Sequence, residues 1–351
     1  MRQIATKKPH KVKILNMGMA ETSIIESSFP RLVADIGGSN ARFGYVPRMG
    51  EKVQFVRTLA VQGHPSPASA AHNYLGSLSA EMQGAYRAPR QAAFAVATAV
   101  TSDQIDLTNS NWQFSCAALQ AELALDKLFV LNDFEALALS LPHLEPSQLR
   151  TLHSAKLAPR GTLAVIGPGT GLGVAGVVQT QNGWVVLPTE GGHATLSAAD
   201  DYEAQILAVA RSQFAHVSAE RLLSGIGLPV LHQAVATVLG KPFVVLTAEQ
   251  IVDAGMAETD ATCSATIDAF CGFFGSFAGN VALTLGARGG VYIGGGIVPR
   301  FGDRFFNSQF RARFIDKGRF SDYLSAVPCA LITDTLVALT GAAIAIDERR
   351  K

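Results

Sequence analysis

Two glycine-rich segments have compositions suited to binding phosphate. The first, residues 35–40 (DIGGSN), lies between two runs of β-forming residues. Its paired glycines, Gly37 and Gly38, let backbone N–H groups approach a phosphate because no Cβ atom stands in the way. Asp35 can hold a hydrated Mg²⁺ ion, and Ser39 can donate its hydroxyl hydrogen. The segment therefore predicts a turn that binds phosphate and metal, although an ordinary glycine-rich β-turn has the same composition.

The second glycine-rich segment spans residues 167–173 (GPGTGLG). Together with Gly176, it contains the G-x-G-x-x-G spacing of dinucleotide-binding folds. That fingerprint opens a helix, whereas Val174, Val177 and Val178 continue a strand. The sequence therefore argues against a dinucleotide-binding fold and indicates a second hairpin turn able to bind phosphate.

Two further places carry side chains that could act on hydroxyl groups. Asp133 follows Asn132, which ends the apolar run 127–132. A carboxylate there suits a base for a substrate hydroxyl, because that proton leaves late in phosphoryl transfer and needs an oriented acceptor more than a strong one. Asn-Asp is equally common as a turn or helix cap. Glu190 and His193 flank two glycines and could bind adjacent hydroxyls of a polyol, although a lone histidine is more often structural.

The elements that must position these residues show a repeated pattern. Residues 31–61 predict three consecutive antiparallel strands, and the same pattern returns from Thr162. Aligning Asp35 with Gly167, an offset of 132 residues (167 − 35 = 132), also superposes Gly37 on Gly169. We therefore predict two related halves, each opening with a β-hairpin, whose glycine turns face one ligand across a cleft.

The rest of the chain predicts alternating strands and helices. Buried parallel strands are expected at 92–100 and 127–132, with a helix between them. Ser197, three residues before Asp200, predicts a capping box that opens a helix. Thr247 and Gln250 predict a similar helix start, residues 289–296 a strand, and residues 335–348 a C-terminal helix.

Composition narrows the function classes. The 351 residues include 29 Lys and Arg against 28 Asp and Glu, a net charge of +1, which argues against a binder of nucleic acid. Hydrophobic residues make up 48 %, enough for a large core. The four cysteines form no C-x-x-C pair, so we expect buried, reduced thiols and neither a zinc site nor a disulfide framework.

One segment has the length of a membrane span. Residues 269–287 carry no charge and include Gly275 and Gly279 in G-x-x-x-G spacing. Polar residues interrupt the stretch, and the chain has no second stretch like it. We therefore predict a buried helix against whose glycines another element packs, and no membrane partner.

Read in order, several segments together resemble the bacterial glucokinase family of the hexokinase/actin-like ATPase superfamily, from about Leu32 to the C-terminus. They are DIGGSN, LNDFEA, GPGTGLG, TEGGH, VSAERLLSG, GGVYIGGGIVPRF and FRARFIDKGRF. The resemblance implies an α/β, two-lobed actin-like ATPase (ribonuclease H-like) fold, with a mixed sheet flanked by helices in each lobe and the active site in the interlobe cleft. We predict an N-terminal extension at 1–30, a smaller lobe at 31–143 plus 335–351, and a larger lobe at 144–334.

The resemblance also implies an activity. The chain would transfer the γ-phosphate of ATP to the 6-hydroxyl of D-glucose, with ATP and Mg²⁺ as cofactors, as a cytoplasmic homodimer. Asp133 would be the catalytic base, and Asp35 would hold Mg²⁺ through water. Residues 294–301 would lie near the adenosine. The implied sugar contacts are Asn132, Asp133, Glu190, His193 and Glu220, and the implied ATP contacts are Asp35, Ile36, Gly37, Gly38, Ser39, Asn40, Gly169, Thr170 and Gly171.

Departures from the family pattern leave alternatives open. Ser39 replaces the usual threonine and keeps the hydroxyl, whereas Ala99, Ser102, Thr195 and Ile226 change residues that shape loops. One alternative is a sugar kinase of the repressor/open-reading-frame/kinase type with another hexose specificity. Such proteins usually carry a cysteine-rich zinc motif after their E-x-G-H segment, which this sequence lacks. The other alternative is a non-catalytic, sugar-binding regulatory relative.

Overall fold

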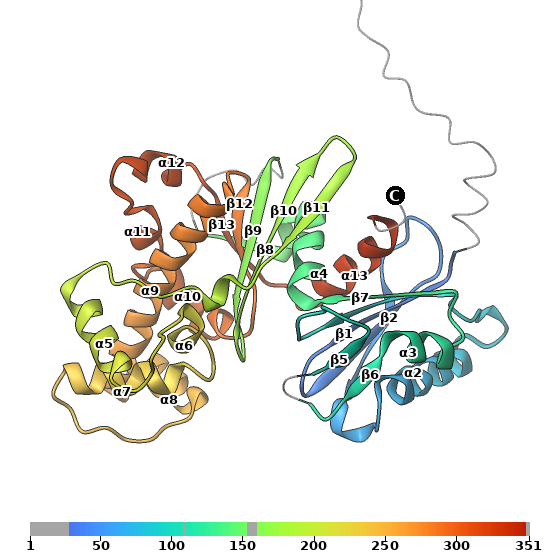
Figure 1. Cartoon of the computed structure of the whole chain (residues 1–351), viewed down its shortest axis with the longest axis horizontal. Helices are drawn as coiled ribbons and strands as arrows, with labels where there is room; N and C mark the ends of the chain where they lie inside the picture. The colour runs from blue at the N-terminus through green and yellow to red at the C-terminus, as the bar shows by residue number, and fades with distance from the viewer. Residues whose placement is uncertain (1–27, 108–109, 153–159, 349–351) are drawn as a thin grey trace, which may run out of the picture.

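The computed structural model describes residues 28–107, 110–152 and 160–348, and its first sheet has five strands in the order β3-β2-β1-β4-β7 (Figure 1). The strands are β1 (Arg31–Ile36), β2 (Asn40–Val46), β3 (Gln54–Ala60), β4 (Gln91–Val96) and β7 (Lys127–Asn132). β1, β2 and β3 form an antiparallel meander, while β4 and β7 run parallel to β1. The predicted meander and the two parallel strands are therefore confirmed, although β4 ends at Val96, four residues before the predicted end.

The second sheet repeats this arrangement in the order β11-β10-β9-β12-β13-β8. Its strands are β8 (Leu149–Thr151), β9 (Thr162–Pro168), β10 (Leu172–Thr180), β11 (Gly183–Pro188), β12 (Gly290–Ile293) and β13 (Cys329–Ile332). β9, β10 and β11 form the meander, β12 and β13 run parallel to β9, and β8 adds an antiparallel edge. The offset of 132 residues carries β1 into β9 and β2 into β10, which confirms the predicted repeat.

Helices cover both faces of the first sheet. One core holds Leu32 and Ala34 of β1 with side chains of α2 (Pro67–Met82) and α3 (Cys116–Glu122), while Val33 points to the opposite core with α4 (Asp133–Ser140) and α13 (Val337–Glu348). This alternation is the period-2 pattern of a strand buried on both faces. The predicted helix between β4 and β7 and the predicted C-terminal helix are confirmed. A short ribbon of β5 (Gln104–Asp106) and β6 (Gln113–Ser115) lies beside them.

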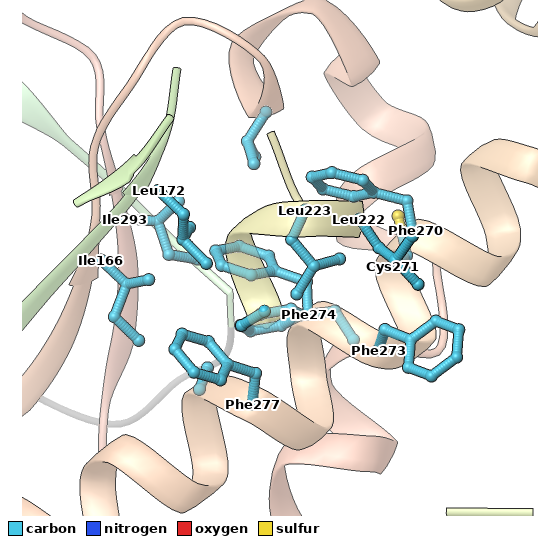
Figure 2. Close-up of a cluster of buried hydrophobic side chains, with 14 of the residues drawn as sticks. Ile166, Leu172, Leu222, Leu223, Phe270, Cys271, Phe273, Phe274, Phe277 and Ile293 are labelled. Atoms are coloured by element: carbon cyan, nitrogen blue, oxygen red, sulfur yellow. The ribbon is translucent and has the colours of Figure 1, made fainter. Parts of the chain in front are cut away.

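The second sheet packs against a long buried helix, α9 (Ala261–Leu285). Phe274 and Phe277 of α9 extend from this helix toward Ile166 and Ile293 of the sheet, while Phe270 packs against Phe301 (Figure 2). Further helices surround α9. They are α5 (Asp201–Arg211), α6 (Ala219–Leu222), α7 (Leu228–Val238), α8 (Ala248–Met256), α10 (Gly302–Phe306), α11 (Phe310–Ile315) and α12 (Ser321–Ser325).

Helix α9 contains the segment that has the length of a membrane span. It is long and apolar enough to cross a membrane, but 83 % of its most apolar window is buried inside the fold. A Cβ atom on Gly275 would overlap the carbonyl oxygen of Phe310, and one on Gly279 would lie 2.5 Å from that of Phe314. The two glycines therefore let α11 pack closely, as predicted for a core helix.

Helix starts test the capping predictions directly. Thr247 and Gln250 form the predicted capping box of α8. The predicted start at Ser197 is wrong, because Asp200 is the N-cap of α5 and its carboxylate accepts the Glu203 N–H at 2.8 Å. An aspartate caps as well as a serine, so the local pattern offered two starts and the structure uses the later one.

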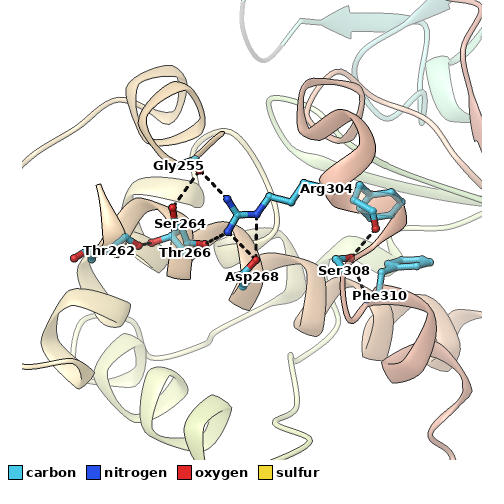
Figure 3. Close-up of polar contacts among 9 residues, drawn as sticks. Gly255, Thr262, Ser264, Thr266, Asp268, Arg304, Ser308 and Phe310 are labelled. Carbon is cyan, nitrogen blue, oxygen red and sulfur yellow. Dashed lines mark hydrogen bonds and ion pairs between the residues drawn. The ribbon is translucent and has the colours of Figure 1, made fainter. Parts of the chain in front are cut away.

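Arg304 of α10 joins the helices that precede it in the chain. Its guanidinium donates to the carbonyl oxygen of Gly255 at 2.7 Å, to that of Ser264 at 3.0 Å and to Asp268 at 2.9 Å (Figure 3). The chain that leaves β12 through η6 (Val298–Phe301) is thereby held against α8 and α9.

Helices α4 and α13 pack on each other between the two sheets (Figure 1). α4 also contacts β9, β10 and β11, and α13 contacts β1 and β4. A Cβ atom on Gly341 of α13 would overlap the carbonyl oxygen of Ala136 in α4. Both helices therefore pack on the first sheet, and α4 also connects it to the second.

The remaining predictions concern the termini and the cysteines. Residues 1–27 of the predicted N-terminal extension lie outside the described residues, while Ser28 and Pro30 are buried. All four cysteines are free thiols; Cys263, Cys271 and Cys329 are buried as predicted, whereas Cys116 is only half-buried, contrary to the prediction.

Candidate active site

Two acidic residues lie at one edge of the first sheet. Asp35 is the penultimate residue of β1, and Asp133 follows the last residue of β7. The register pairs Ile36 with Val96 and Val96 with Asn132, so the carboxyl ends of these parallel strands are level. Ligands of parallel α/β sheets bind at this edge, which makes it the first candidate for chemistry.

The carboxyl group of Asp133 has an unusual affinity for protons. Burial, and then the charge of the neighbouring Asp35, raise the pKa of Asp133 to about 7. The N–H of Phe134, which donates to Asp133 Oδ1 at 2.9 Å, opposes that rise. A carboxylate with this pKa can accept a proton near neutral pH, as a general base must.

The carboxylate of Asp35 is paired with Arg42, its cross-strand partner on β2. Arg42 Nη1 lies 3.0 Å from Asp35 Oδ2. Burial raises the pKa of Asp35, and the guanidinium of Arg42 opposes this rise. The sequence interpretation missed Arg42, although a hairpin that turns at residues 38–39 places position 42 opposite position 35.

The side chain of Asn132 hydrogen-bonds to the backbone around it. Its Oδ1 caps α4 by accepting the Phe134 N–H at 2.9 Å, and its Nδ2 donates to the carbonyl oxygen of Thr98 at 3.1 Å. The helix-cap interpretation of Asn-Asp is thus correct for Asn132, whose side chain also hydrogen-bonds to the carboxyl group of Asp133.

The first hairpin turn presents backbone rather than bulky side chains. The Gly37 N–H donates to the carbonyl oxygen of Asn40 at 2.9 Å, and Ser39 and Asn40 are exposed. The side chain of Ile36 is fully buried, so only its backbone can face a ligand. A Cβ atom on Gly37 would lie 3.6 Å from its nearest neighbour, an ordinary contact.

The second hairpin turn is held by the loop that links α6 to α7. The Gly169 N–H donates to the carbonyl oxygen of Gly171 at 2.8 Å, and the Gly225 N–H donates to that of Gly169 at 2.8 Å. Ile226, one of the departures from the family pattern, donates its N–H to the carbonyl oxygen of Thr170 at 3.4 Å. The side chain of Thr170 remains exposed at the tip of the turn.

Glu220 and His193 lie together beside this second turn. Glu220 Oε2 accepts the Leu172 N–H at 2.8 Å, and Glu220 Oε1 lies 3.9 Å from His193 Nδ1. A Cβ atom on Gly171 would lie 2.5 Å from Glu220 Oε2, so only glycine lets the carboxylate approach. The predicted sugar contacts Glu220 and His193 are therefore adjacent, although they are 27 residues apart in the chain.

The remaining predicted contacts surround this pair. Glu190 is exposed and precedes the 3₁₀ turn Gly191–His193. A Cβ atom on Gly192 would overlap the carbonyl oxygen of Leu172, so the turn lies directly on β10. Gly295, within the predicted adenosine segment, has φ +76° and lies against the carbonyl oxygen of Pro168 at the end of β9.

Metal binding has few protein ligands available. Within residues 28–107, 110–152 and 160–348, no group of three or more His, Cys, Asp or Glu side chains is arranged to hold an ion. Mg²⁺ is commonly held by one or two carboxylates together with substrate phosphates and water. The charge of Asp35 acts on the nearby carboxyl group of Asp133. Asp35 therefore fits a Mg²⁺ ion that binds together with a phosphate ligand.

The chain is similar over most of its length to known proteins. The glucokinase family model matches residues 32–349. The chain is similar to a glucokinase of Aromatoleum aromaticum, with 46 % identity over 91 % of this chain and 95 % of the relative. Among solved structures, it is similar to a glucokinase from an Antarctic psychrotroph, with a TM-score of 0.83 and 36 % identity over 91 % of this chain and 99 % of the other.

A more distant structure shares the fold. It is a glucokinase of Balamuthia mandrillaris in complex with glucose, with a TM-score of 0.72 and 18 % identity over 93 % of this chain and 98 % of the other. The α/β fold with mixed sheets flanked by helices is thus that of sugar kinases of the actin-like class, as the sequence predicted.

Proposed function

Because this chain belongs to the glucokinase family, we propose that it transfers the γ-phosphate of ATP to the 6-hydroxyl of D-glucose. The observation that carries the proposal is the half-buried carboxyl group of Asp133, at the sheet edge beside Asp35, with a pKa of about 7. A carboxyl group with a strongly raised pKa at the carboxyl edge of a sheet is typical of a catalytic site, which favours an enzyme over a non-catalytic relative.

The proposed step moves one proton and one phosphoryl group. Asp133 accepts the proton of the 6-hydroxyl as that oxygen forms a bond to the γ-phosphorus of ATP. The bond from the γ-phosphorus to the β–γ bridging oxygen breaks, and ADP leaves with its electron pair. Bound Mg²⁺, held through water by Asp35, would neutralise charge on the phosphates.

The two hairpin turns would bind the phosphates of ATP from opposite sides. Residues 35–40 offer backbone N–H groups and the Ser39 hydroxyl, and residues 169–171 offer a second glycine turn. Such preorganised donors stabilise charge in the transition state because they need no rearrangement during the reaction. The segment 294–301, which begins against the second turn, would lie at the adenosine end.

Sugar recognition is proposed for the second cluster. Glu190, His193 and Glu220 would bind sugar hydroxyls, with Glu220 fixed in place by the Leu172 N–H. A site whose polar groups are paired by substrate hydroxyls can reject an analogue lacking one by roughly 10⁴-fold. The homodimer and the cytoplasmic location are predictions that rest on the family resemblance.

The test is a panel of sugars. Initial rates of ADP release are measured with glucose, fructose, mannose, galactose and N-acetylglucosamine, each with Mg²⁺ and ATP. The proposal expects selective turnover of glucose, with glucose 6-phosphate as the product. Faster turnover of another hexose would assign a different specificity, while glucose binding without turnover would indicate a sugar-binding relative.

A further inference from the structure

Phe134, the residue after the proposed base, lies across the second hairpin. A Cβ atom on Gly167 would lie 2.5 Å from its Cζ atom, and one on Gly173 would overlap Cδ2 and Cε2 of the same ring. Gly167 and Gly173 are direct cross-strand partners on β9 and β10. The ring therefore rests on two facing glycines, a seat that no other residue type could form.

This seat is unusual for a buried sheet. Glycine within a strand weakens it and typically marks a place where another group must come close to the backbone. Here both members of one cross-strand pair are glycine, and the group that comes close is an aromatic ring from α4. One turn further along α4, Leu137 lies 2.9 Å from the Cβ position of Gly294. The N-terminal end of α4 thus packs directly on the second sheet.

The contact of Phe134 with Gly167 and Gly173 links the proposed base to the hairpin beside Glu220, because each partner is adjacent in sequence to a site residue or its support. Asp133 precedes Phe134, and Gly173 follows Leu172, whose N–H holds Glu220. The thickness of the ring therefore spaces the base from the hairpin that carries the second glycine turn. A flexible side chain would leave this spacing undefined.

We propose that Phe134 is a positioning residue, whose ring on Gly167 and Gly173 fixes the carboxylate of Asp133 relative to the second hairpin. This inference rests on the proposed function, since it assigns how the base of that reaction is placed. Misplacement of a reacting group by about 1 Å can cost on the order of 100-fold in rate. The expected signature is therefore a loss of kcat with little change in KM for either substrate.

Phe134→Leu in the full chain tests the inference, with Leu139→Ala as its matched control. Leu139 lies on the same helix but packs in the core of the first sheet, away from the glycine seat. Both variants are assayed well below their melting temperatures. We expect Phe134→Leu to lower kcat about 10- to 100-fold, with each KM within about threefold of wild type. Leu139→Ala should lower Tm at least as much, with kcat within about twofold.

A second pair of variants separates spacing from stability. Gly173→Ala should lower Tm in the wild-type background because its methyl group overlaps the ring. In a Phe134→Ala background the same methyl group fills vacated space and should restore part of the Tm. Rescue of Tm without rescue of kcat supports the positioning role, whereas rescue of both shows that the ring serves only the fold.

The outcomes are distinguishable from failure of the proposed function. A wild-type chain that phosphorylates no hexose overturns the proposed function, and this inference with it. An active wild-type chain whose Phe134→Leu variant keeps the kcat of the Leu139→Ala control overturns the inference alone.

Discussion

The two hairpins of the repeat share their strand arrangement and differ in the side chains that they carry at equivalent positions. In the first, Ile36 lies opposite Ala41, and in the second, Pro168 lies opposite Leu172, so the second turn is one residue shorter. Asp35 of the first corresponds by the repeat offset to Gly167 of the second. Where the first hairpin sets a carboxylate against a guanidinium, the second sets two bare glycines against an aromatic ring.

The difference shows how one architecture serves two purposes. The first hairpin contributes charge, since Asp35 raises the pKa of Asp133 and pairs with Arg42. The second contributes shape, since its glycines admit Phe134 and Glu220 to the backbone. Glycine substitutions in and against the second hairpin should therefore damage packing, whereas substitutions in the first should change charge and binding while leaving the fold intact.

The largest expected effect is on the packing of the second region. Gly295→Ala places a methyl group where it overlaps the carbonyl oxygen of Pro168, on a residue with φ +76°. Overpacking and backbone strain together should lower the free energy of unfolding by about 3 kcal/mol or more. Urea denaturation monitored by circular dichroism measures this change. A variant as stable as wild type would show that the second region is not tightly packed.

Glu220→Gln should have the next largest effect, on sugar use. The amide keeps the shape but removes the charge of a group that accepts the Leu172 N–H. A hydrogen bond to a charged group contributes roughly 1.5–3 kcal/mol, so kcat/KM for glucose should fall about 10- to 100-fold. The control is Glu122→Gln, an exposed residue on α3 that should leave kcat/KM unchanged. Equal values for both variants would remove Glu220 from the sugar site.

The charge carried by the first region predicts a pH dependence. The pKa of Asp133 is raised from 3.8 to about 7, and the base must be ionised to accept a proton. Lowering the pH below 7 should therefore reduce kcat/KM for glucose by about tenfold per unit, with a plateau at higher pH. Rates measured from pH 5.5 to 8.5 with constant Mg²⁺ test this. A flat profile across that range would mean that no group with this pKa limits the reaction.

The smallest expected effect separates the hairpins most cleanly. Gly37→Ala adds a methyl group that meets only the Asn40 carbonyl oxygen at 3.6 Å. The free energy of unfolding should change by less than about 0.5 kcal/mol. The affinity of the Gly37→Ala variant for ATP should nevertheless fall, because the methyl group stands where a phosphate would approach. A large loss of stability would make the two hairpins alike and remove the contrast drawn between them.

Most strands and helices could be predicted from the sequence, because local patterns of residues determine them. Strand-forming runs with glycine turns predicted both meanders, and the polar interruptions and glycines of residues 269–287 predicted the buried helix α9. The start of α5 was misplaced, because Ser197 and Asp200 are both good caps and only tertiary packing chooses between them.

The contacts that assemble the candidate site were not readable in the same way. The seat of Phe134 joins residues 33 and 39 positions apart, and the Glu220 carboxylate meets a backbone N–H 48 positions away. No local spacing encodes such pairs. Glu220 was assigned through the family resemblance and Phe134 was assigned no role, whereas the contacts of both emerged only from the folded chain.

The most direct test of the account is Asp133→Asn, assayed for binding and chemistry separately. Calorimetry measures glucose affinity, and single-turnover phosphorylation with Mg²⁺ and ATP measures the chemical step. The account predicts a folded variant that binds glucose within a few-fold of wild type and phosphorylates it roughly 10²- to 10⁴-fold more slowly. Phosphorylation at the wild-type rate would contradict the assignment of Asp133 as the base.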